Sequence, residues 1–177
     1  LTPFYERHRE LGAEFVTSAG WERPEWFEAN AGIVPSDAPW VRRDGWAAQL
    51  WSPIEGAEHL ATRSKAALFD LTPFAKLDVE GPDAPAYLER ICANRIDRPV
   101  GTIVYTAMLT DSGGVRCDLT IARKGEELFR VVTGGGSGQH DLAWMRRQIR
   151  GHERVRISER TGSLFALGLW GPRAREI

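Results

Sequence analysis

The stretch from Tyr105 to Ile121, YTAMLTDSGGVRCDLTI, predicts two strands joined by a tight turn. The turn falls on residues 111–114, Asp-Ser-Gly-Gly, where the glycines are free to take positive φ. After the turn, apolar and polar residues alternate, so successive side chains point to opposite faces of the second strand. One face is expected to hold Val115, Cys117, Leu119 and Ile121, and the other Arg116, Asp118 and Thr120.

Asp118 is the residue of this strand that most needs an explanation. Aspartate is a poor strand former because its carboxylate competes with the ladder for backbone hydrogen bonds. From the pattern alone, it either lies on an exposed face where Arg116 or Arg123 pairs with it, or serves chemistry in a cleft. Tyr105 lies on the paired strand and could face the same cavity with a flat ring and a hydroxyl. A half-buried structural tyrosine is the alternative for that residue.

The composition is that of an ordinary globular protein, with 177 residues, 42% hydrophobic, 27% charged, and a formal net charge of −1. The near-zero charge gives no electrostatic case for binding nucleic acid. No apolar run approaches the roughly 20 residues that span a bilayer. The charged start, LTPFYERHRE, does not fit a signal peptide. Cys92 and Cys117 lie in apolar patterns, which favours reduced thiols in a cytoplasmic compartment.

The periodicity of the chain predicts an α+β fold, with antiparallel strands and packed helices. Helices are expected over residues 4–15, 55–69, 83–93 and 138–150, and strands over 75–80, 128–133, 155–159 and 164–170 besides the hairpin. Residues 20–53 carry five tryptophans and four prolines, among them Pro39, and predict an irregular segment that wraps a body or joins another domain. The expected division is a lead-in over 1–53 and a domain over 54–177.

One internal similarity suggests a duplicated strand-to-helix corner. Residues 77–84, LDVEGPDA, are matched by residues 167–174, LGLWGPRA. Both predict a strand, Gly-Pro and the start of a helix, and the second copy stops at Ile177. The match is short, so chance is the alternative.

Three other features have simple explanations. The glycine-rich loop over residues 134–138 lacks the phosphate-loop and dinucleotide patterns, so we expect a flexible joint with Ser137 as helix N-cap. The four histidines have no nearby cluster of other ligands at metal-binding spacing, so we expect no metal site. Arg146, Arg147 and Arg150 form a basic helix edge that is either solvated or in contact with a partner.

Three blocks of residues occur in the order found in a known family. They are TPFYE (2–6) with GWERPEWF (20–27), ALFDLTPF (67–74) with VEGPDA (79–84), and YTAML (105–109) through GGVRCDLT (113–120) with HDLAW (140–144). In these blocks the chain resembles the aminomethyltransferase (glycine-cleavage T-protein) family. It looks most like the folate-binding C-terminal part of dimethylglycine and sarcosine dehydrogenases.

The resemblance implies the N-terminal portion of a T-protein-like folate-binding domain. Its activity would be tetrahydrofolate-dependent transfer of a one-carbon unit from a methylated amine or aminomethyl donor, giving 5,10-methylenetetrahydrofolate. The family's folate-site aspartate falls on Asp118, whose implied role is to orient the pterin and relay a proton, and Tyr105 falls where a ring often lies against the folate. The family often has Asp-Asp or Ser-Asp where this chain has Cys117-Asp118.

The resemblance also sets the limits of the expected activity. The family draws further pocket residues from sequence beyond the position of Ile177, and FAD would belong to an upstream flavoprotein part before Leu1. We therefore expect a fragment that is inactive alone, in which Asp118 faces a hollow large enough for a pterin. The alternatives are a non-catalytic folate-binding or flavoprotein-docking module, and a structural role in which the tryptophan-rich 20–53 segment is the docking surface.

Overall fold

The structure is a computed structural model that describes residues 1–38, 40 and 43–177; Pro39 of the proline-rich segment lies outside the described residues. The chain forms two compact units. One consists of Leu1–Leu71 with Ala166–Ile177, and the other of Thr72–Phe165. These contacts group residues 54–71 with the first unit, and the expected lead-in over 1–53 stays a prediction.

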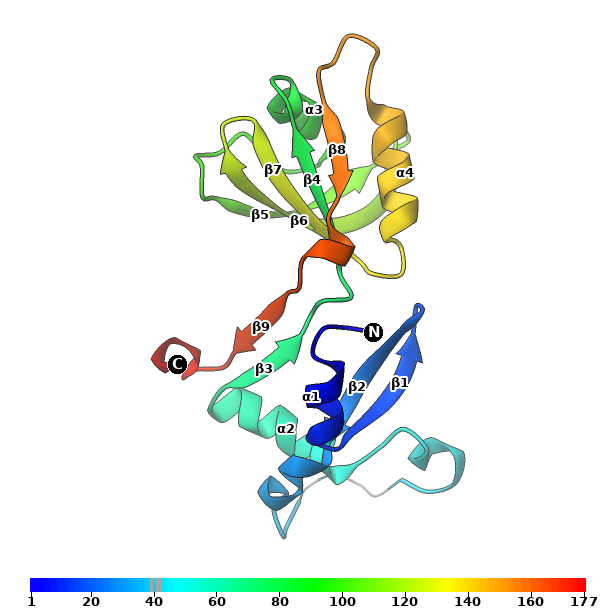
Figure 1. The fold of residues 1–177 in the computed structure, drawn as a ribbon, viewed down its shortest axis with the longest axis vertical. Helices are drawn as coiled ribbons and strands as arrows, with labels where there is room; N and C mark the ends of the chain where they lie inside the picture. Colours follow the sequence, from blue (N-terminus) through cyan, green and yellow to red (C-terminus); the bar gives the residue numbers. More distant parts are fainter. Residues whose placement is uncertain (39, 41–42) are drawn as a thin grey trace. The chain divides into compact units, whose positions relative to one another are not determined.

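The Thr72–Phe165 unit is built on a five-stranded antiparallel sheet with the order β5-β6-β7-β4-β8 (Figure 1). The strands are β4 (Ala75–Glu80), β5 (Ile103–Leu109), β6 (Val115–Gly125), β7 (Leu128–Thr133) and β8 (Arg156–Glu159). Two helices, α3 (Ala84–Ile91) and α4 (Gly138–Gln148), and the short 3-10 helix η3 (Thr161–Ser163) complete the unit. The expected α+β fold, the hairpin and the antiparallel meander are confirmed.

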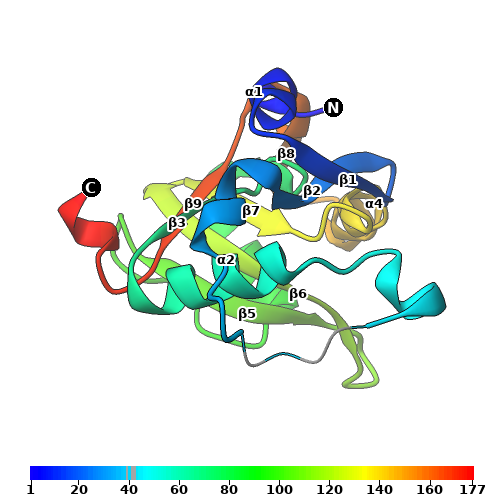
Figure 2. The same cartoon turned by 90° about the horizontal axis from the view of Figure 1, so that it is seen from below.

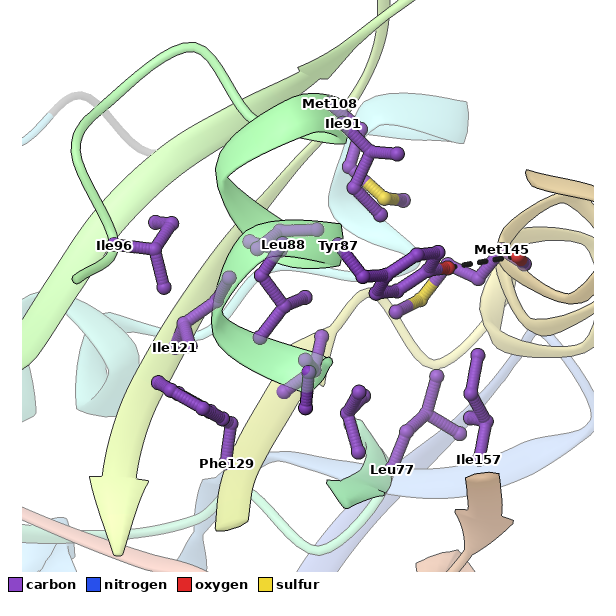
Figure 3. Close-up of a cluster of buried hydrophobic side chains, with 14 of the residues drawn as sticks. Leu77, Tyr87, Leu88, Ile91, Ile96, Met108, Ile121, Phe129, Met145 and Ile157 are labelled. Carbon is purple, nitrogen blue, oxygen red and sulfur yellow. Dashed lines mark hydrogen bonds between the residues drawn. The ribbon is translucent and has the colours of Figure 1, made fainter. Parts of the chain in front are cut away.

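The core of this unit lies between one face of the sheet and the two helices. Alternate residues of β4, β6 and β7 are buried there, as the period of two requires: Leu77, Val79, Leu119, Ile121, Phe129 and Val131. Figure 3 shows Tyr87 of α3 reaching Met145 of α4, where its hydroxyl donates to the Met145 carbonyl at 2.7 Å. Both helices therefore cover the same sheet face, and the opposite face carries the polar residues of the alternation.

The other unit holds smaller elements. Helix α1 (Tyr5–Glu10) stands beside the antiparallel hairpin of β1 (Ala13–Ser18) and β2 (Trp21–Phe27) (Figure 1 and Figure 2). Two 3-10 helices, η1 (Glu28–Ile33) and η2 (Gly45–Ala48), precede α2 (Pro53–Ser64). The pair β3 (Ala67–Asp70) and β9 (Leu167–Trp170) is antiparallel and is followed by η4 (Ala174–Glu176). Ser52 caps α2, accepting a hydrogen bond from the Ile54 amide.

The expected helix over residues 4–15 is wrong in its second half. Gly12 takes φ +69°, its N–H closes on the Arg9 carbonyl, and the chain turns into β1, where Phe15 lies. Residues 21–27, expected to be irregular, form β2. Pro24 is tolerated there because the strand belongs to a two-stranded ribbon and the pairing is irregular next to it.

The expected helix over 55–69 ends early, at Ser64, and its last residues belong to β3. Leu60 and Leu68, expected on the inner stripe, are 42% and 62% exposed. Ile54 and Ala57 are the buried residues of α2. Strand β9 begins three residues later than expected, at Leu167.

The two Gly-Pro corners have the same backbone form. Gly81 after β4 has φ +129° and Gly171 after β9 has φ +117°. In each corner the glycine carbonyl accepts a hydrogen bond from an alanine three residues on, Ala84 or Ala174. The first corner opens α3, whereas the second opens only the 3-10 turn η4. The internal duplication stays a prediction, but its corner geometry recurs.

Candidate functional site

Tyr105 and Asp118 lie together on the sheet face opposite the helices. Asp118 pairs with Ala107 and Tyr105 with Thr120, so the two side chains are diagonal neighbours on one face of the β5–β6 ribbon. Tyr105 Oη donates a hydrogen bond to Asp118 Oδ2 at 2.5 Å. The two strands thus bring these residues to one place, as their positions on paired strands allowed.

The pair is electrostatically simple. The Tyr105 hydroxyl donates a hydrogen bond to the Asp118 carboxylate. This hydrogen bond, together with the negative charge of the carboxylate, raises the pKa of Tyr105. Ionised tyrosine beside a carboxylate would place two negative charges in contact, so the tyrosine stays a donor. Both side chains are exposed, Tyr105 to 66%.

The arginine partners considered for Asp118 are engaged elsewhere. The guanidinium of Arg116 contacts the His140 ring at the start of α4. Arg123 donates to Asp97 at 2.6 Å and to Glu126 at 3.3 Å. In the described part of the chain no cation lies within salt-bridge distance of Asp118.

The same face holds a second carboxylate, which is paired with an arginine of the protein. Asp78 on β4 receives two hydrogen bonds from Arg130 on β7, at 2.8 and 2.9 Å, and both side chains are largely buried. Such a bidentate pair neutralises Asp78 within the protein. Of these two carboxylates, only Asp118 keeps its charge available to a molecule from outside.

The hollow expected beside Asp118 does not coincide with either of two hollows of this unit. One runs along α3, lined by Pro85, Ala86, Glu89, Arg90 and Asp97, and the other lies beside α4. Neither is lined by Asp118 or Tyr105. The physical reason is that no element of this unit covers the polar face of the β5–β6 ribbon, so the pair stands on an open surface.

The glycine-rich loop before α4 is a packed joint. A Cβ on Gly135 would lie 2.2 Å from the Pro73 carbonyl oxygen, so the backbone passes too closely for a side chain. Ser137 occupies the N-cap position, but its hydroxyl makes no capping bond and instead donates to Asp141 at 2.8 Å. Asp141 is buried and also accepts from Thr133 at 2.7 Å, which ties the start of α4 to β7.

The remaining candidate groups are accounted for by packing. Burial raises the pKa of the Cys92 thiol to about 12 and that of Cys117 to about 11, so both stay protonated and unreactive. Among the described residues, no three His, Cys, Asp or Glu side chains gather as metal ligands would. Nor does any described helix have the length and apolar character to cross a membrane.

Comparison with known proteins places this geometry in a family. The family model of the GCVT N-terminal domain matches residues 4–177. The chain is 33% identical over 177 residues to an aminomethyltransferase of Desulfitobacterium hafniense, covering 99% of this chain and 41% of that protein. The aminomethyltransferase T of the Bartonella henselae glycine cleavage system has a similar structure, with a TM-score of 0.76 and 27% identity over 99% of this chain and 41% of that one.

Two larger relatives match at a similar identity. A 4-methylaminobutanoate oxidase (formaldehyde-forming) of Paenarthrobacter nicotinovorans is 36% identical over 176 residues, which is 99% of this chain and 20% of the oxidase. The mitochondrial dimethylglycine dehydrogenase of Rattus norvegicus is 36% identical over 160 residues, or 90% of this chain and 18% of the dehydrogenase. The chain thus spans about two fifths of the aminomethyltransferases and about one fifth of these larger enzymes.

Proposed function

Because the chain belongs to the GCVT N-terminal domain family, we propose that it serves tetrahydrofolate-dependent one-carbon transfer as part of a larger enzyme. The reaction would give 5,10-methylenetetrahydrofolate from a methylated amine or an aminomethyl donor. The observation that carries the proposal is the Tyr105–Asp118 pair, a carboxylate without a cation on the open face of the β5–β6 ribbon.

The residues of the pair fit a planar, nitrogen-rich ligand. The exposed ring of Tyr105 offers a flat surface, and Asp118 Oδ1 remains to accept a hydrogen bond while Oδ2 holds the tyrosine hydroxyl. A negative charge at this point would also stabilise a cationic iminium donor. Bound tetrahydrofolate would supply the nucleophilic nitrogen that receives the one-carbon unit.

Asp118 is proposed as the proton acceptor of the transfer. As the nitrogen–carbon bond forms, the attacking nitrogen becomes acidic and its N–H bond breaks, and the Asp118 carboxylate takes the proton directly or through one water. Tyr105 is proposed to orient that carboxylate by its hydrogen bond. No residue of this chain is assigned to FAD, which in such enzymes would act on a flavoprotein part.

The relatives support the donor class. Two of them are named for N-methylated amine substrates, dimethylglycine and 4-methylaminobutanoate. The second candidate function is a folate-binding module without catalysis, and the observation that favours it is the solvent exposure of Asp118 in this chain. The two functions differ in turnover, because a module binds folate without consuming a donor.

The test uses the larger enzyme of which this chain is proposed to be a part, as the wild type, Asp118→Asn and Tyr105→Phe, and measures tetrahydrofolate binding by calorimetry and formation of methylenetetrahydrofolate. We expect Asp118→Asn to lower transfer by about 100-fold or more while binding falls less, since a general base contributes about 10²–10⁴. Asp44→Asn is the matched control, because Asp44 is exposed and caps no helix with its side chain. Transfer by Asp118→Asn at the wild-type rate would remove Asp118 from the mechanism, and binding without any transfer by the wild type would favour the module.

A further inference from the structure

A second hollow of the Thr72–Phe165 unit lies away from the Tyr105–Asp118 pair. It has a volume of about 280 Å³ and is formed by the ends of α3 and α4 and the tip of the β5–β6 hairpin. Its charged lining residues are Arg90, Asp111, Arg147 and Arg150, and Trp144 lies among them. Neither Asp118 nor Tyr105 lines it.

The hollow presents opposite charges that do not touch each other. Arg147 and Asp111 are both exposed, and in the described part of the chain neither side chain has a hydrogen-bond or ion-pair partner. Arg147 and Asp111 form no ion pair with each other, so the two charges stand apart on one hollow. Charges of opposite sign held apart in this way leave space for a ligand between them.

The other two arginines differ in their freedom. Arg90 is committed to the protein, because it donates to both oxygens of Glu153 at 2.8 Å and to the Gln148 carbonyl. Arg150 is exposed and lies within electrostatic reach of Glu153, whose other contacts already include Arg90. Arg147 is therefore the principal cation available in the hollow, and Arg150 the second.

The exposed lining of the hollow is mostly polar and the space is small. Trp144, whose ring is half-buried, is the aromatic residue among those that line it. Binding sites for drug-sized molecules occupy about 300–1,000 Å³, so this volume suits a ligand of a few carbon atoms. A short methylene linker between two charged ends needs little apolar surface, which fits a lining of this kind.

We propose that this hollow binds a small zwitterion of the amino-acid class. The ligand's ammonium group would donate to Asp111, its carboxylate would accept from Arg147 with Arg150 beside it, and its short carbon chain would lie between these charges, near Trp144. Charge-assisted hydrogen bonds at both ends give selectivity, because a ligand with one charged end leaves the other protein charge without a partner. The inference concerns binding alone and does not depend on the proposed folate chemistry.

The experiment titrates the chain with glycine, 3-aminopropanoate and 4-aminobutanoate. Binding is followed by the assigned indole N–H signal of Trp144 in NMR spectra. As controls, butanoate carries only the carboxylate and butylamine only the ammonium group. We expect the best zwitterion to shift the Trp144 signal and to bind at least tenfold more tightly than either single-charge compound. Arg147→Gln and Asp111→Asn should each weaken it about tenfold or more, the effect of losing one hydrogen bond between charged groups.

Two controls remove the same charges elsewhere. Arg95 is exposed and has no side-chain partner in the described part of the chain, and Asp44 likewise makes no capping bond, so Arg95→Gln and Asp44→Asn should bind like the wild type. Equal binding of butanoate and 4-aminobutanoate would make this an anion site and overturn the proposal. So would an Asp111→Asn variant of undiminished affinity, or a Trp144 signal that no zwitterion shifts.

Discussion

Replacing Tyr87 by phenylalanine tests the contact that joins α3 to α4. A helix leaves its last carbonyls without intrahelical donors. The Met145 carbonyl is one of them, because the Ile149 amide donates instead to Arg146. The Tyr87 hydroxyl supplies the missing donor at 2.7 Å from a fully buried position, as Figure 3 shows.

The expected loss of stability follows from the carbonyl that would be left without a donor. Tyr87→Phe keeps the ring but leaves a buried carbonyl without a partner, which costs about 1–3 kcal/mol. With a urea m-value of about 2 kcal/mol/M, a 2 kcal/mol loss lowers the midpoint of unfolding by about 1 M. Tyr105→Phe is the matched control, because it removes a hydroxyl from an exposed pair and should change stability by about 0.5 kcal/mol at most.

The measurement is urea unfolding followed by circular dichroism, with amide hydrogen exchange at the end of α4. If Tyr87→Phe and Tyr105→Phe had the same midpoint and slope, the Met145 carbonyl would have another donor, and the reasoning would be refuted.

The pH dependence of unfolding provides a second check. Burial raises the pKa of Tyr87 in the folded state, so its stabilising effect is full below pH 10 and falls as the pH rises above that value. Tyr87→Phe should lose less stability than the wild type in that alkaline range.

Three more outcomes follow from the contacts. Gly81→Ala should destabilise the chain by about 3 kcal/mol or more in urea unfolding, because the new Cβ would lie 2.0 Å from a backbone oxygen at φ +129°, whereas Gly151→Ala, with open space around it, serves as control. Asp118→Asn should lower the pKa of Tyr105 toward 10 in an ultraviolet titration, because the carboxylate is what raises it, and an unchanged titration would contradict the pairing. Both cysteine thiols, with pKa values of about 12 and 11, should react slowly with iodoacetamide at pH 8 in the native chain and rapidly in urea; equal rates would contradict their burial.

The sequence predicted the Thr72–Phe165 unit well because its signals are local. Strict alternation after a Gly-Gly turn leaves one register for the β5–β6 hairpin, and the same period placed Leu77 and Val79 in the core. The diagonal meeting of Tyr105 and Asp118 followed from that register. Their role toward folate stays a prediction, because the sequence of a strand does not show which other segment covers its exposed face.

The failures lie where distant segments decide the structure. Residues 67–70 continue the apolar pattern of α2 without a break, yet they form β3 because β9, about 100 residues later, pairs with them. Phe15 matched a helical spacing by coincidence, and only the positive φ of Gly12 separates α1 from β1. The acceptor of the Tyr87 hydroxyl cannot be predicted from its own segment, because it lies 58 residues away; a tyrosine between buried helix positions indicates only that some acceptor lies nearby.

The polar face of the sheet explains why one aspartate is the better candidate for chemistry. Asp78 and Asp118 both stand on strands, where aspartate is disfavoured. Arg130 neutralises Asp78 with two hydrogen bonds, so that carboxylate is explained by the fold itself. Asp118 receives one hydrogen bond from a neutral hydroxyl, and no cation among the described residues pairs with it, so its charge is not neutralised within the described chain. A strand carboxylate that the fold does not use is the group to which a cationic one-carbon donor would be drawn, and that is the physical basis of the proposed function.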